Sequence, residues 1–525
     1  MQKKRYTAIT IGPIGDTLGM VTKPAALWAA SYMFSFISRK ICEEIVQRTG
    51  APENIITPYF PLEKERTDGV GLFHDHIIVR DEDGVLLQSM PDIRKSVLQT
   101  AAEIFGFSDT QAQEYIMIRA CSFETDEEKK ENIILKCGPM LDCMELAGKF
   151  SSVETVNPIL SSFTNQHIRD SVREKLGIDP KNWQLVCPNS DSETFRFRDI
   201  RGIAETAENS VWKKNNYYCL LRADGDNMTS IISSLQKTNE NDPSCEEQCR
   251  AFSKVCLDYC SKVADRVGAY GGVTIYAGGD DLFALVPCEG IVEENTSTVF
   301  SLMKSVRELF DECFADYIGG IRAFNETLPE DKKSEKKDIP TLSFGALICH
   351  KKYPLYEAVA QSYDLLTQVA KNREGKNAAA VQLLKHSGQS ESLVFSCTSL
   401  EGICELLDTI ISAKSAEEAS DREQVLLSAA QKILLFEALF ENADPEFIKN
   451  LFVNTFDADA HQEGAKNFLH ECLPEFFARY CVSGQICAHA AGKKQKSPTK
   501  AFTFGQLLRM MKFFVEKGDD ADGSV

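Results

Sequence analysis

The chain has 525 residues, of which 43% are hydrophobic and 26% are charged, and its formal net charge at pH 7 is −19. This composition is typical of an ordinary globular protein, and the length leaves room for three or four domains. The net negative charge argues against a protein that coats nucleic acid through its overall field.

The 18 cysteines contain no Cys-x-x-Cys pair. Cys245/Cys249 and Cys256/Cys260 are four residues apart, which suits a helix face better than a zinc knuckle. We therefore expect buried or partly buried thiols in a reducing cytoplasm. The sequence shows no signal peptide pattern and no apolar run long enough to cross a membrane, so we expect a cytoplasmic location and no membrane partner.

The first 121 residues alternate between strand and helix patterns and are expected to form one domain. Its predicted elements are a strand at 6–11, a helix from Pro24 to Gly50, a hairpin from 76–79 and 85–87, a helix at 92–105 and a strand at 115–120. Residues 122–210 are expected to form a linking domain, with a charged stretch at 124–132, helical patterns at 135–150 and 165–176, and a short strand at 183–187.

Residues 211–388 are expected to repeat the first domain's topology. An apolar run after Asn216, a helical pattern around 252–263 and two apolar runs within 273–287 give the order strand, helix, strand, turn, strand. In such a split βαβ sheet the third strand lies between the first two and is antiparallel to both. A strand at 341–349, a helix at 355–369 and a strand at 379–384 complete this domain.

A tight turn separates the two apolar runs of 273–287. We place it at Gly278-Gly279 as a type I′ turn, because both central positions of that turn need a positive φ. Asp280 and Asp281 follow the turn, and adjacent aspartates at the start of a half-buried strand need a cationic partner. On its own the motif would favour a solvated turn rich in Gly and Asp.

A second acidic segment is predicted to lie beside that turn. The first strand of the domain ends at Asp224 and Asp226, and its carboxyl end meets the turn that begins the third strand. Asp224 should therefore lie near Asp280 and Asp281, which is the geometry for one or two Mg²⁺ or Mn²⁺ ions. Such ions hold nucleotide phosphates and activate a 3′-hydroxyl.

Residues 389–525 show helical periodicity and are expected to form a C-terminal helical domain. The segment 492–500 is a basic loop, which suits contact with RNA phosphate or an acidic partner and equally suits a solvated loop. The tail 518–525 is expected to be disordered.

Four stretches together resemble the large palm-domain subunit of type III CRISPR RNA-guided effector complexes, in particular the Cmr-type (III-B-like) branch. They are Ile11-Gly-Pro-Ile14 with Leu27-Trp-Ala-Ala-Ser-Tyr32, Asp224-Gly-Asp-Asn-Met228, Gly278-Gly-Asp-Asp281, and Ser343-x-Gly345 followed by Pro354-Leu-Tyr356, Ala370-Lys371 and Lys376-Asn377. The resemblance implies an α+β fold with two ferredoxin-like palm domains, the first of them degenerate.

The same resemblance implies an activity. Family members of this kind bind two ATP molecules between paired palms when target RNA is held by the complex, and join them into 3′–5′ linked, usually cyclic, oligoadenylate messengers. The implied partners are the guide RNA, the target RNA and the repeat-tag-binding, backbone and small subunits. One branch of the family instead couples AMP to S-adenosylmethionine, and that alternative stays open.

The resemblance also implies roles for individual residues. Asp224, Asp280 and Asp281 would be the metal ligands and catalytic acids, with Asp226 either a ligand or an orienting acceptor. The backbone amides of the Gly225-Asp226-Asn227 junction could hold a triphosphate, beside the Gly278-Gly279 turn. Lys371 and Lys376 would neutralise phosphate charge or would be solvated lysines, and Ser343 would contact adenine or ribose or would be an ordinary strand serine.

Two features of the family have no counterpart that we recognise. The His74-Asp75 dipeptide does not lie on a metal-binding helix pattern, so we expect a variant without the HD nuclease domain and without its DNase activity. The Cys₄ zinc site of some relatives has no clear match in Cys121, Cys137, Cys143 and Cys187, so zinc is not expected.

Two other functions compete with this interpretation. A stand-alone nucleotide cyclase such as a diguanylate synthase is disfavoured by the paired palms and by the Gly-Gly-Asp-Asp turn. A catalytically idle scaffold subunit is disfavoured because four acids are present, and idle buried carboxylates are costly to keep.

Overall fold

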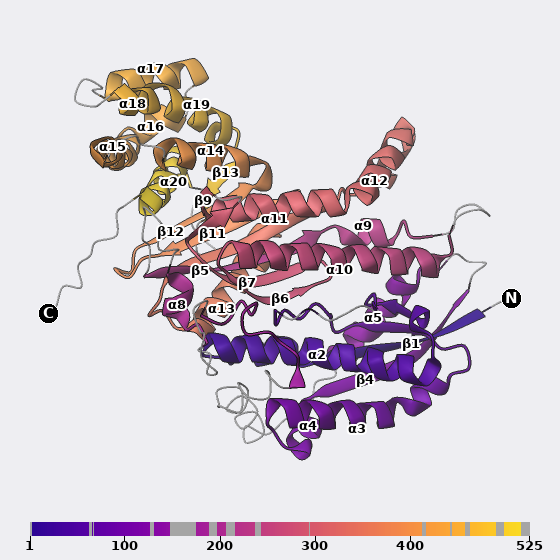
Figure 1. Cartoon of the computed structure of the whole chain (residues 1–525). Helices are drawn as coiled ribbons and strands as arrows, with labels where there is room; N and C mark the ends of the chain where they lie inside the picture. The colour runs from indigo at the N-terminus through magenta and orange to yellow at the C-terminus, as the bar shows by residue number, and fades with distance from the viewer. Residues whose placement is uncertain are drawn as a thin grey trace.

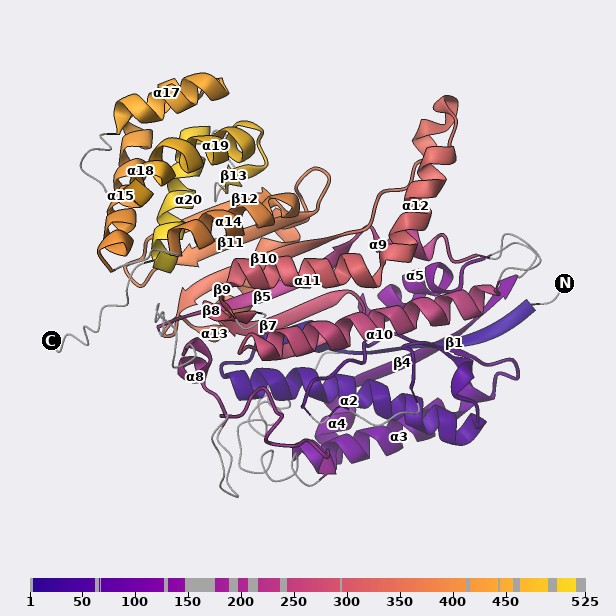
Figure 2. The same cartoon turned by 45° about the horizontal axis from the view of Figure 1, so that its top comes forward.

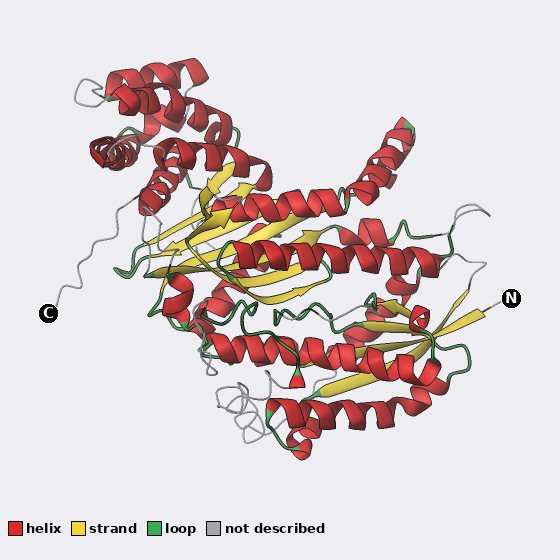
Figure 3. Cartoon of the chain, in the orientation of Figure 1, coloured by secondary structure: helices red, strands yellow, loops and turns green. Residues whose placement is uncertain are grey.

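The computed structural model confirms the predicted α+β class and shows two α+β domains and a C-terminal helical region (Figure 1). Figure 3 shows the larger sheet between the C-terminal helices and the smaller sheet, which lies nearer the N-terminus. The structure describes residues 3–61, 66, 68–126, 131–146, 175–187, 197–205, 216–236, 243–292, 295–411, 416–441, 444–456, 463–489 and 498–515.

The first domain is a four-stranded antiparallel sheet covered by helices. Its strands are β1 (Lys3–Gly12), β2 (Ile55–Thr57), β3 (Ile77–Arg80) and β4 (Met117–Asp126), in the spatial order β2-β3-β1-β4. Its main helices are α2 (Pro24–Thr49), α3 (Val85–Phe105) and α4 (Asp109–Tyr115), with the short α1 (Ile14–Gly19) between β1 and α2. Gly50 and Gly106 end α2 and α3 with φ of 67° and 79°, conformations that favour glycine.

The second domain uses a seven-stranded sheet in the order β13-β12-β11-β10-β5-β7-β6. Five of these strands come from the expected domain: β5 (Tyr217–Asp226), β6 (Val273–Gly278), β7 (Asp281–Pro287), β10 (Thr341–His350) and β11 (Ala378–Leu384). Strand β7 lies between β5 and β6 and is antiparallel to both, as the sequence predicts.

Helices cover both faces of this second sheet. Alternate residues of its strands enter two separate cores, so Leu221 packs with α10 (Cys245–Ala269) and α11 (Val299–Cys313), while Leu220 packs with α13 (Leu355–Asp364) and the first domain. The helix α12 (Ala315–Thr327) continues from α11 and projects from the body in both views (Figures 1 and 2). Helices α9 (Met228–Ile232) and α8 (Ile200–Ala204) and the two-stranded sheet of β8 (Glu289–Val292) and β9 (Asn295–Thr298) complete this part.

The two domains share one topology. The orders β2-β3-β1-β4 and β6-β7-β5-β10 match strand by strand, and α2 and α10 occupy equivalent positions after the first strand of each set. The packing between the domains is reciprocal, because α10 contacts β2 while α2 contacts β6. The first domain is thus a structural copy that packs against the second.

One predicted element of the first domain is wrong. Residues 85–87, expected as the second strand of a hairpin, form the first turn of α3, and β3 pairs instead with β1 and β2. A three-residue apolar run is too short to distinguish a strand from the first turn of an amphipathic helix. The strand expected at 115–120 is β4, which extends to Asp126 and so crosses the expected boundary at residue 121.

The expected linking domain lies mostly outside the described residues. Within it, α5 (Ile133–Leu146) is helical as expected and packs on β1 and β4 of the first domain. The stretch 183–187 contains a single isolated bridge, between Val186 and Phe197, rather than a strand. The segment 165–174, the basic stretch 492–497 and the tail 518–525 lie outside the described part of the chain.

The C-terminal region is helical, as expected, but its strands belong to the second sheet. Its helices are α14 (Leu400–Ile411), α15 (Ala416–Leu435), α16 (Glu437–Glu441), α17 (Pro445–Thr455), α18 (Glu463–Asn467), α19 (Leu473–Phe476) and α20 (Lys500–Val515). Strand β12 (Ser390–Ser396) pairs with β11, and β13 (Ile486–Ala488) pairs with β12. The sheet therefore continues past the boundary expected at residue 388.

The burial of the cysteines agrees with the sequence prediction, because all 18 except Cys143 are buried or partly buried. Within the described residues, no helix has both the length and the apolar character needed to span a membrane.

Candidate active site

The acid-bearing strand ends lie side by side. The ladder between β5 and β7 ends at the pair Ala223–Leu282, which places Asp224 next to Asp281 at the same edge of the sheet. The turn itself differs from the expectation: Gly278 pairs with Asp281, so Gly279 and Asp280 are the two central residues. Only Gly279 of these has a positive φ, 69°, which fits a type II′ turn rather than type I′.

Asp280 packs directly against the end of β5. A Cβ atom added to Gly225 would lie 2.4 Å from Asp280 Oδ2 and 3.0 Å from its Cβ. Only glycine allows this approach, so the space beside Gly225 is where the two acidic segments meet.

We expect Gly225→Ala to displace Asp280 and to lower about 100-fold the nucleotidyl transfer that the family resemblance implies, since a small misplacement of a reacting group has this effect. The measurement is turnover of labelled ATP by the assembled complex. Gly319→Ala is the matched control, because a Cβ added there meets nothing within 4 Å. Full activity of Gly225→Ala would contradict a role for this contact.

Lys371 supplies a positive charge to the acids. Its Nζ lies 2.6 Å from Asp224 Oδ1 and donates a hydrogen bond of 3.2 Å to the carbonyl oxygen of Gly225. Both side chains of the ion pair are partly exposed, at 22% for Lys371 and 29% for Asp224. The lysine follows the π-helical turn η3 (Leu365–Ala370), which approaches β10 closely because position 345 is glycine: a Cβ there would lie 2.6 Å from the backbone nitrogen of Leu366.

Burial and nearby negative charge favour the protonated forms of Asp280 and Asp281. Burial, followed by the charge of Asp224, raises the pKa of Asp280 to about 7, although Lys371 and hydrogen bonds from the backbone of Asp280 and Gly225 act in the opposite direction. Burial of its surroundings, followed by the charges of Asp224 and Asp280, raises the pKa of Asp281. The Asp281 side chain itself is exposed, so solvent screens this effect. Asp280 is therefore the carboxyl whose titration falls near neutral pH.

This shift predicts how pH acts on metal binding. Between about pH 4 and 7 the folded chain keeps a proton on Asp280 that the unfolded chain has released, so the free energy of unfolding without metal falls as pH rises. A cation needs the carboxylate, so Mg²⁺ affinity should rise by up to about tenfold per pH unit below pH 7 and level off above it. Calorimetric titration of Mg²⁺ between pH 5.5 and 8.5 measures this.

Asp280→Asn is the control for that experiment and should remove most of the pH dependence in this range. A steep dependence retained by the variant would assign the titration to another group.

Asp226 faces the protein interior rather than the other acids. It is fully buried, and its Oδ2 accepts hydrogen bonds from Thr341 Oγ1 (2.9 Å), Ser343 Oγ (2.7 Å) and the backbone N–H of Asn377 (3.0 Å). Of the two roles that the sequence left open, these contacts support the orienting acceptor. Its Oδ1 has no hydrogen-bond partner among the described residues.

Ser343 is not available to a nucleotide in this structure. It is fully buried, donates to Asp226 and accepts a hydrogen bond from the backbone N–H of Ala378 at 3.2 Å. The expected contact with adenine or ribose is therefore replaced by a link between β10, β5 and the start of β11.

A loop in an uncommon backbone conformation brings the second predicted lysine to this edge. Gly375, Lys376 and Asn377 have φ of 78°, 50° and 45°, and two of these three left-handed residues are not glycine. Lys376 Nζ donates to Asn227 Oδ1 at 3.2 Å, and Asn227 is itself left-handed with φ 57°. Asn227 precedes α9, which is only five residues long, so the Gly225-Asp226-Asn227 junction is mainly a strand end rather than the start of a long helix.

The three aspartates suit a hard cation, although their oxygens are not arranged as a closed coordination sphere. Carboxylate oxygens are the ligands that Mg²⁺ and Mn²⁺ prefer, and the Asp224, Asp280 and Asp281 set brings them together beside a lysine. Their oxygens do not all lie within 4.8 Å of one another; within the described residues, the group that meets this spacing is Asp75, His76 and Glu145.

Sequence reasoning missed Thr341 and the backbone of Asn377 as supports of Asp226. Thr341 lies two positions before Ser343 on the same strand and so shares its face. That spacing was a usable signal, whereas the contact from Asn377 depends on a left-handed loop.

Two family models match this chain. The family model described as "Cas10/Cmr2, second palm domain" matches residues 217–380, and the model described as "CRISPR-associated protein Cmr2, N-terminal" matches residues 6–134. Together these ranges span more than half of the chain. The fold is thus that of the palm-type nucleotidyl cyclases and transferases. The chain belongs to the Cas10/Cmr2 family.

One related sequence and two solved structures are similar to this chain. The CRISPR system Cmr subunit Cmr2 of Pyrococcus furiosus is 27% identical over 210 residues, which cover 37% of this chain and only 21% of that relative. The structure of the type III-B Cmr-beta complex bound to cognate target RNA matches with a TM-score of 0.53 and 11% identity, over 98% of this chain and 83% of that one. The Csm1–Csm4 cassette in complex with cA4 gives a TM-score of 0.53 and 14% identity, over 98% and 70%.

Proposed function

We propose that the chain is the nucleotidyltransferase of a type III CRISPR complex and makes cyclic oligoadenylate from ATP when the complex holds target RNA. The observation that carries this proposal is the meeting of Asp224, Asp280 and Asp281, from two separate segments, at one sheet edge beside Lys371.

Each group at this edge has a role in phosphoryl transfer. The three aspartates would hold Mg²⁺ or Mn²⁺, which when bound supplies charge neutralisation of phosphates and activation of a 3′-hydroxyl. No covalent nucleophile is needed, because positioning and charge stabilisation account for this type of transfer. Asp226 would fix the strand ends that carry the acids through its three hydrogen bonds.

The two lysines would meet the triphosphate of ATP. Lys371 now pairs with Asp224, so a cation that takes over this carboxylate would leave the ammonium group to face phosphate oxygens. Lys376 is hydrogen-bonded to Asn227 and would provide a second contact.

The family relationship supports the assembly that we propose. The solved relatives include a Cmr-beta complex bound to cognate target RNA and a Csm1–Csm4 cassette bound to cA4. By this likeness the partners of the chain are the guide RNA, the target RNA and the repeat-tag-binding, backbone and small subunits.

The test is incubation of the assembled complex with Mg²⁺ and labelled ATP, with and without matching RNA. We expect cyclic oligoadenylate only with matching RNA. Product made without RNA by the lone chain would favour a stand-alone cyclase, and no product under either condition would favour a scaffold. A parallel reaction with S-adenosylmethionine distinguishes the alternative messenger, since AMP would then be joined to that cofactor.

A further inference from the structure

The shared topology of the two domains assigns a counterpart to the acid-bearing edge. Strands β1 and β3 of the first domain correspond to β5 and β7 of the second. The last pair of the ladder towards the carboxyl end of β5 is Ala223–Leu282, and the equivalent last pair of β1 is Ile9–Ile77. The next positions along each ladder are therefore equivalent.

The equivalent positions carry polar, metal-ligating side chains. Thr10 corresponds to Asp224, His76 to Asp281 and Asp75 to Asp280. The edge that looks degenerate from the sequence thus retains a carboxylate and an imidazole where the second domain has two carboxylates.

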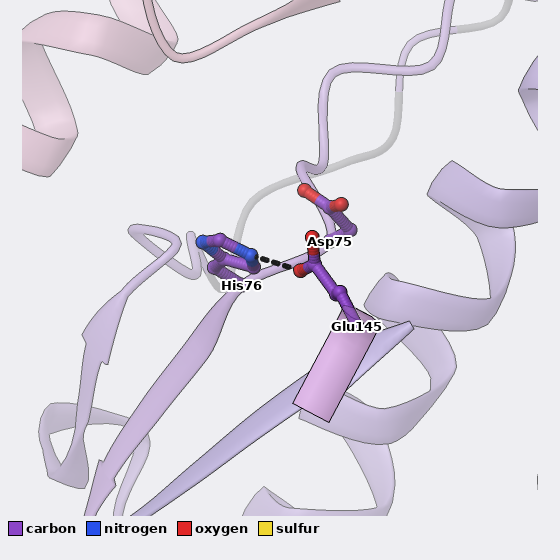
Figure 4. Close-up of side chains that lie close together, drawn as sticks. All are labelled: Asp75, His76 and Glu145. Atoms are coloured by element: carbon purple, nitrogen blue, oxygen red, sulfur yellow. Dashed lines mark hydrogen bonds and ion pairs between the residues drawn. The ribbon is translucent and has the colours of Figure 1, made fainter. Parts of the chain in front are cut away.

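A third ligand-type side chain joins them from α5. Glu145 Oε1 lies 2.6 Å from His76 Nε2 and accepts a hydrogen bond of 2.7 Å from Thr10 Oγ1. Figure 4 shows Asp75 and His76 just before β3, with Glu145 reaching them from the end of α5. Asp75, His76 and Glu145 each offer one ligand atom, and these three atoms lie within 4.8 Å of one another.

This cluster lies near the acids of the second domain. Burial raises the pKa of Tyr276, and the charges of Asp281 and Asp75 raise it further, so both carboxylates are within electrostatic reach of one hydroxyl on β6. His74 is not part of the cluster, because its ring is buried and lies 3.0 Å from Thr57 Oγ1.

We propose that Asp75, His76 and Glu145 bind one divalent transition-metal ion, for which Mn²⁺ is a suitable probe, on the first domain. One imidazole nitrogen and two carboxylate oxygens form a mixed donor set that suits Mn²⁺, Fe²⁺ or Zn²⁺ better than Mg²⁺, which prefers oxygen ligands throughout. The hydrogen bond from Thr10 would hold Glu145 in place, as outer-shell partners of metal ligands do.

The test separates this ion from any ion at the second domain. Titrating Mn²⁺ into the reduced full-length Asp224→Asn/Asp280→Asn/Asp281→Asn variant avoids both the catalytic acids and the cysteines, since Mn²⁺ prefers oxygen and nitrogen ligands. Electron paramagnetic resonance of free Mn²⁺ gives the stoichiometry, and we expect one bound ion per chain. The electron spin echo of the bound ion should carry nitrogen modulation from His76.

Further changes in the same background identify the ligands. His76→Gln and Glu145→Gln should each weaken Mn²⁺ binding at least about tenfold, and His76→Gln should also remove the nitrogen modulation. His470→Gln and Glu124→Gln are matched controls elsewhere on the chain and should bind as the parent does. The Glu145 side chain is 41% exposed, so Glu145→Gln is expected to fold and keeps the test decisive if His76→Gln does not.

Absence of bound Mn²⁺ from the triple variant would overturn the proposal. Binding that survives both His76→Gln and Glu145→Gln would overturn it too, because the ion would then lie elsewhere. Neither result affects the proposed nucleotidyl transfer, which depends on the second domain.

Discussion

Replacing Asp281 by Asn is expected to lower cyclic oligoadenylate formation by about 1000-fold or more. A bound metal ion contributes several kcal/mol of charge stabilisation to phosphoryl transfer, and about 1.4 kcal/mol corresponds to a factor of ten in rate. Asn keeps the shape of the side chain but removes the negative charge, so binding of the cation and not the fold should fail. The measurement is single-turnover conversion of labelled ATP by the complex with matching RNA, together with calorimetric titration of Mg²⁺.

The matched control is Asp311→Asn in the same domain. The Asp311 side chain is 53% exposed and pairs with Arg307 at 3.8 Å on the surface of α11, so its loss should leave both activity and Mg²⁺ affinity unchanged. If Asp281→Asn retained the parent's rate, the acids at this edge would not be the metal ligands and the proposed chemistry would be wrong.

Replacing Asp226 by Ala is expected to have its largest effect on stability. The change removes the acceptor of three hydrogen bonds at a fully buried position. The donors Thr341, Ser343 and the N–H of Asn377 are then left without this acceptor. Each buried donor left without an acceptor costs about 1–3 kcal/mol. Because the two hydroxyls can rotate to other acceptors, we expect the total loss in the free energy of unfolding to be about 3 kcal/mol. Urea unfolding of the metal-free chain, followed by tryptophan fluorescence and circular dichroism, measures it.

Asp224→Ala provides the comparison, because Asp224 lies only two residues away and is partly exposed. Its loss breaks one partly exposed ion pair and relieves repulsion among the acids, so the unfolding free energy should change by less than about 1 kcal/mol. Equal destabilisation by the two changes would show that the two aspartates do not have the separate roles that their contacts indicate.

The architecture of the active edge could be predicted from sequence because its signals are local and strong. The alternation of apolar runs, the glycines of the turn and the strand order of a split βαβ unit together place Asp224 near Asp280 and Asp281. The ladder between β5 and β7 confirms that placement. The predicted turn was displaced by one residue and its type was wrong, because the sequence Gly-Gly-Asp-Asp does not show at which residue the pairing of β6 with β7 ends.

The orientation of individual side chains depended on residues far away in the chain. Asp226 and Asp224 look alike in sequence, but Thr341 and Ser343, more than a hundred positions later, turn Asp226 towards the interior. The pairing of β12 with β11 was missed because residues 390–392 are polar and carry little strand signal. The Asp75, His76 and Glu145 group was missed because Glu145 comes from a helix outside the expected domain, and only the fold brings it to β3.

The continuation of the second sheet through β12 and β13 has a consequence for the design of shorter fragments. A fragment cut at residue 388 would uncover one side of β11, whose residues Ala378–Val381 are buried in the full chain. An apolar strand with unpaired backbone groups is a template for pairing with other copies, so such a fragment should self-associate. A fragment meant to preserve this domain must therefore extend through Ala488, which pairs with Leu393 of β12.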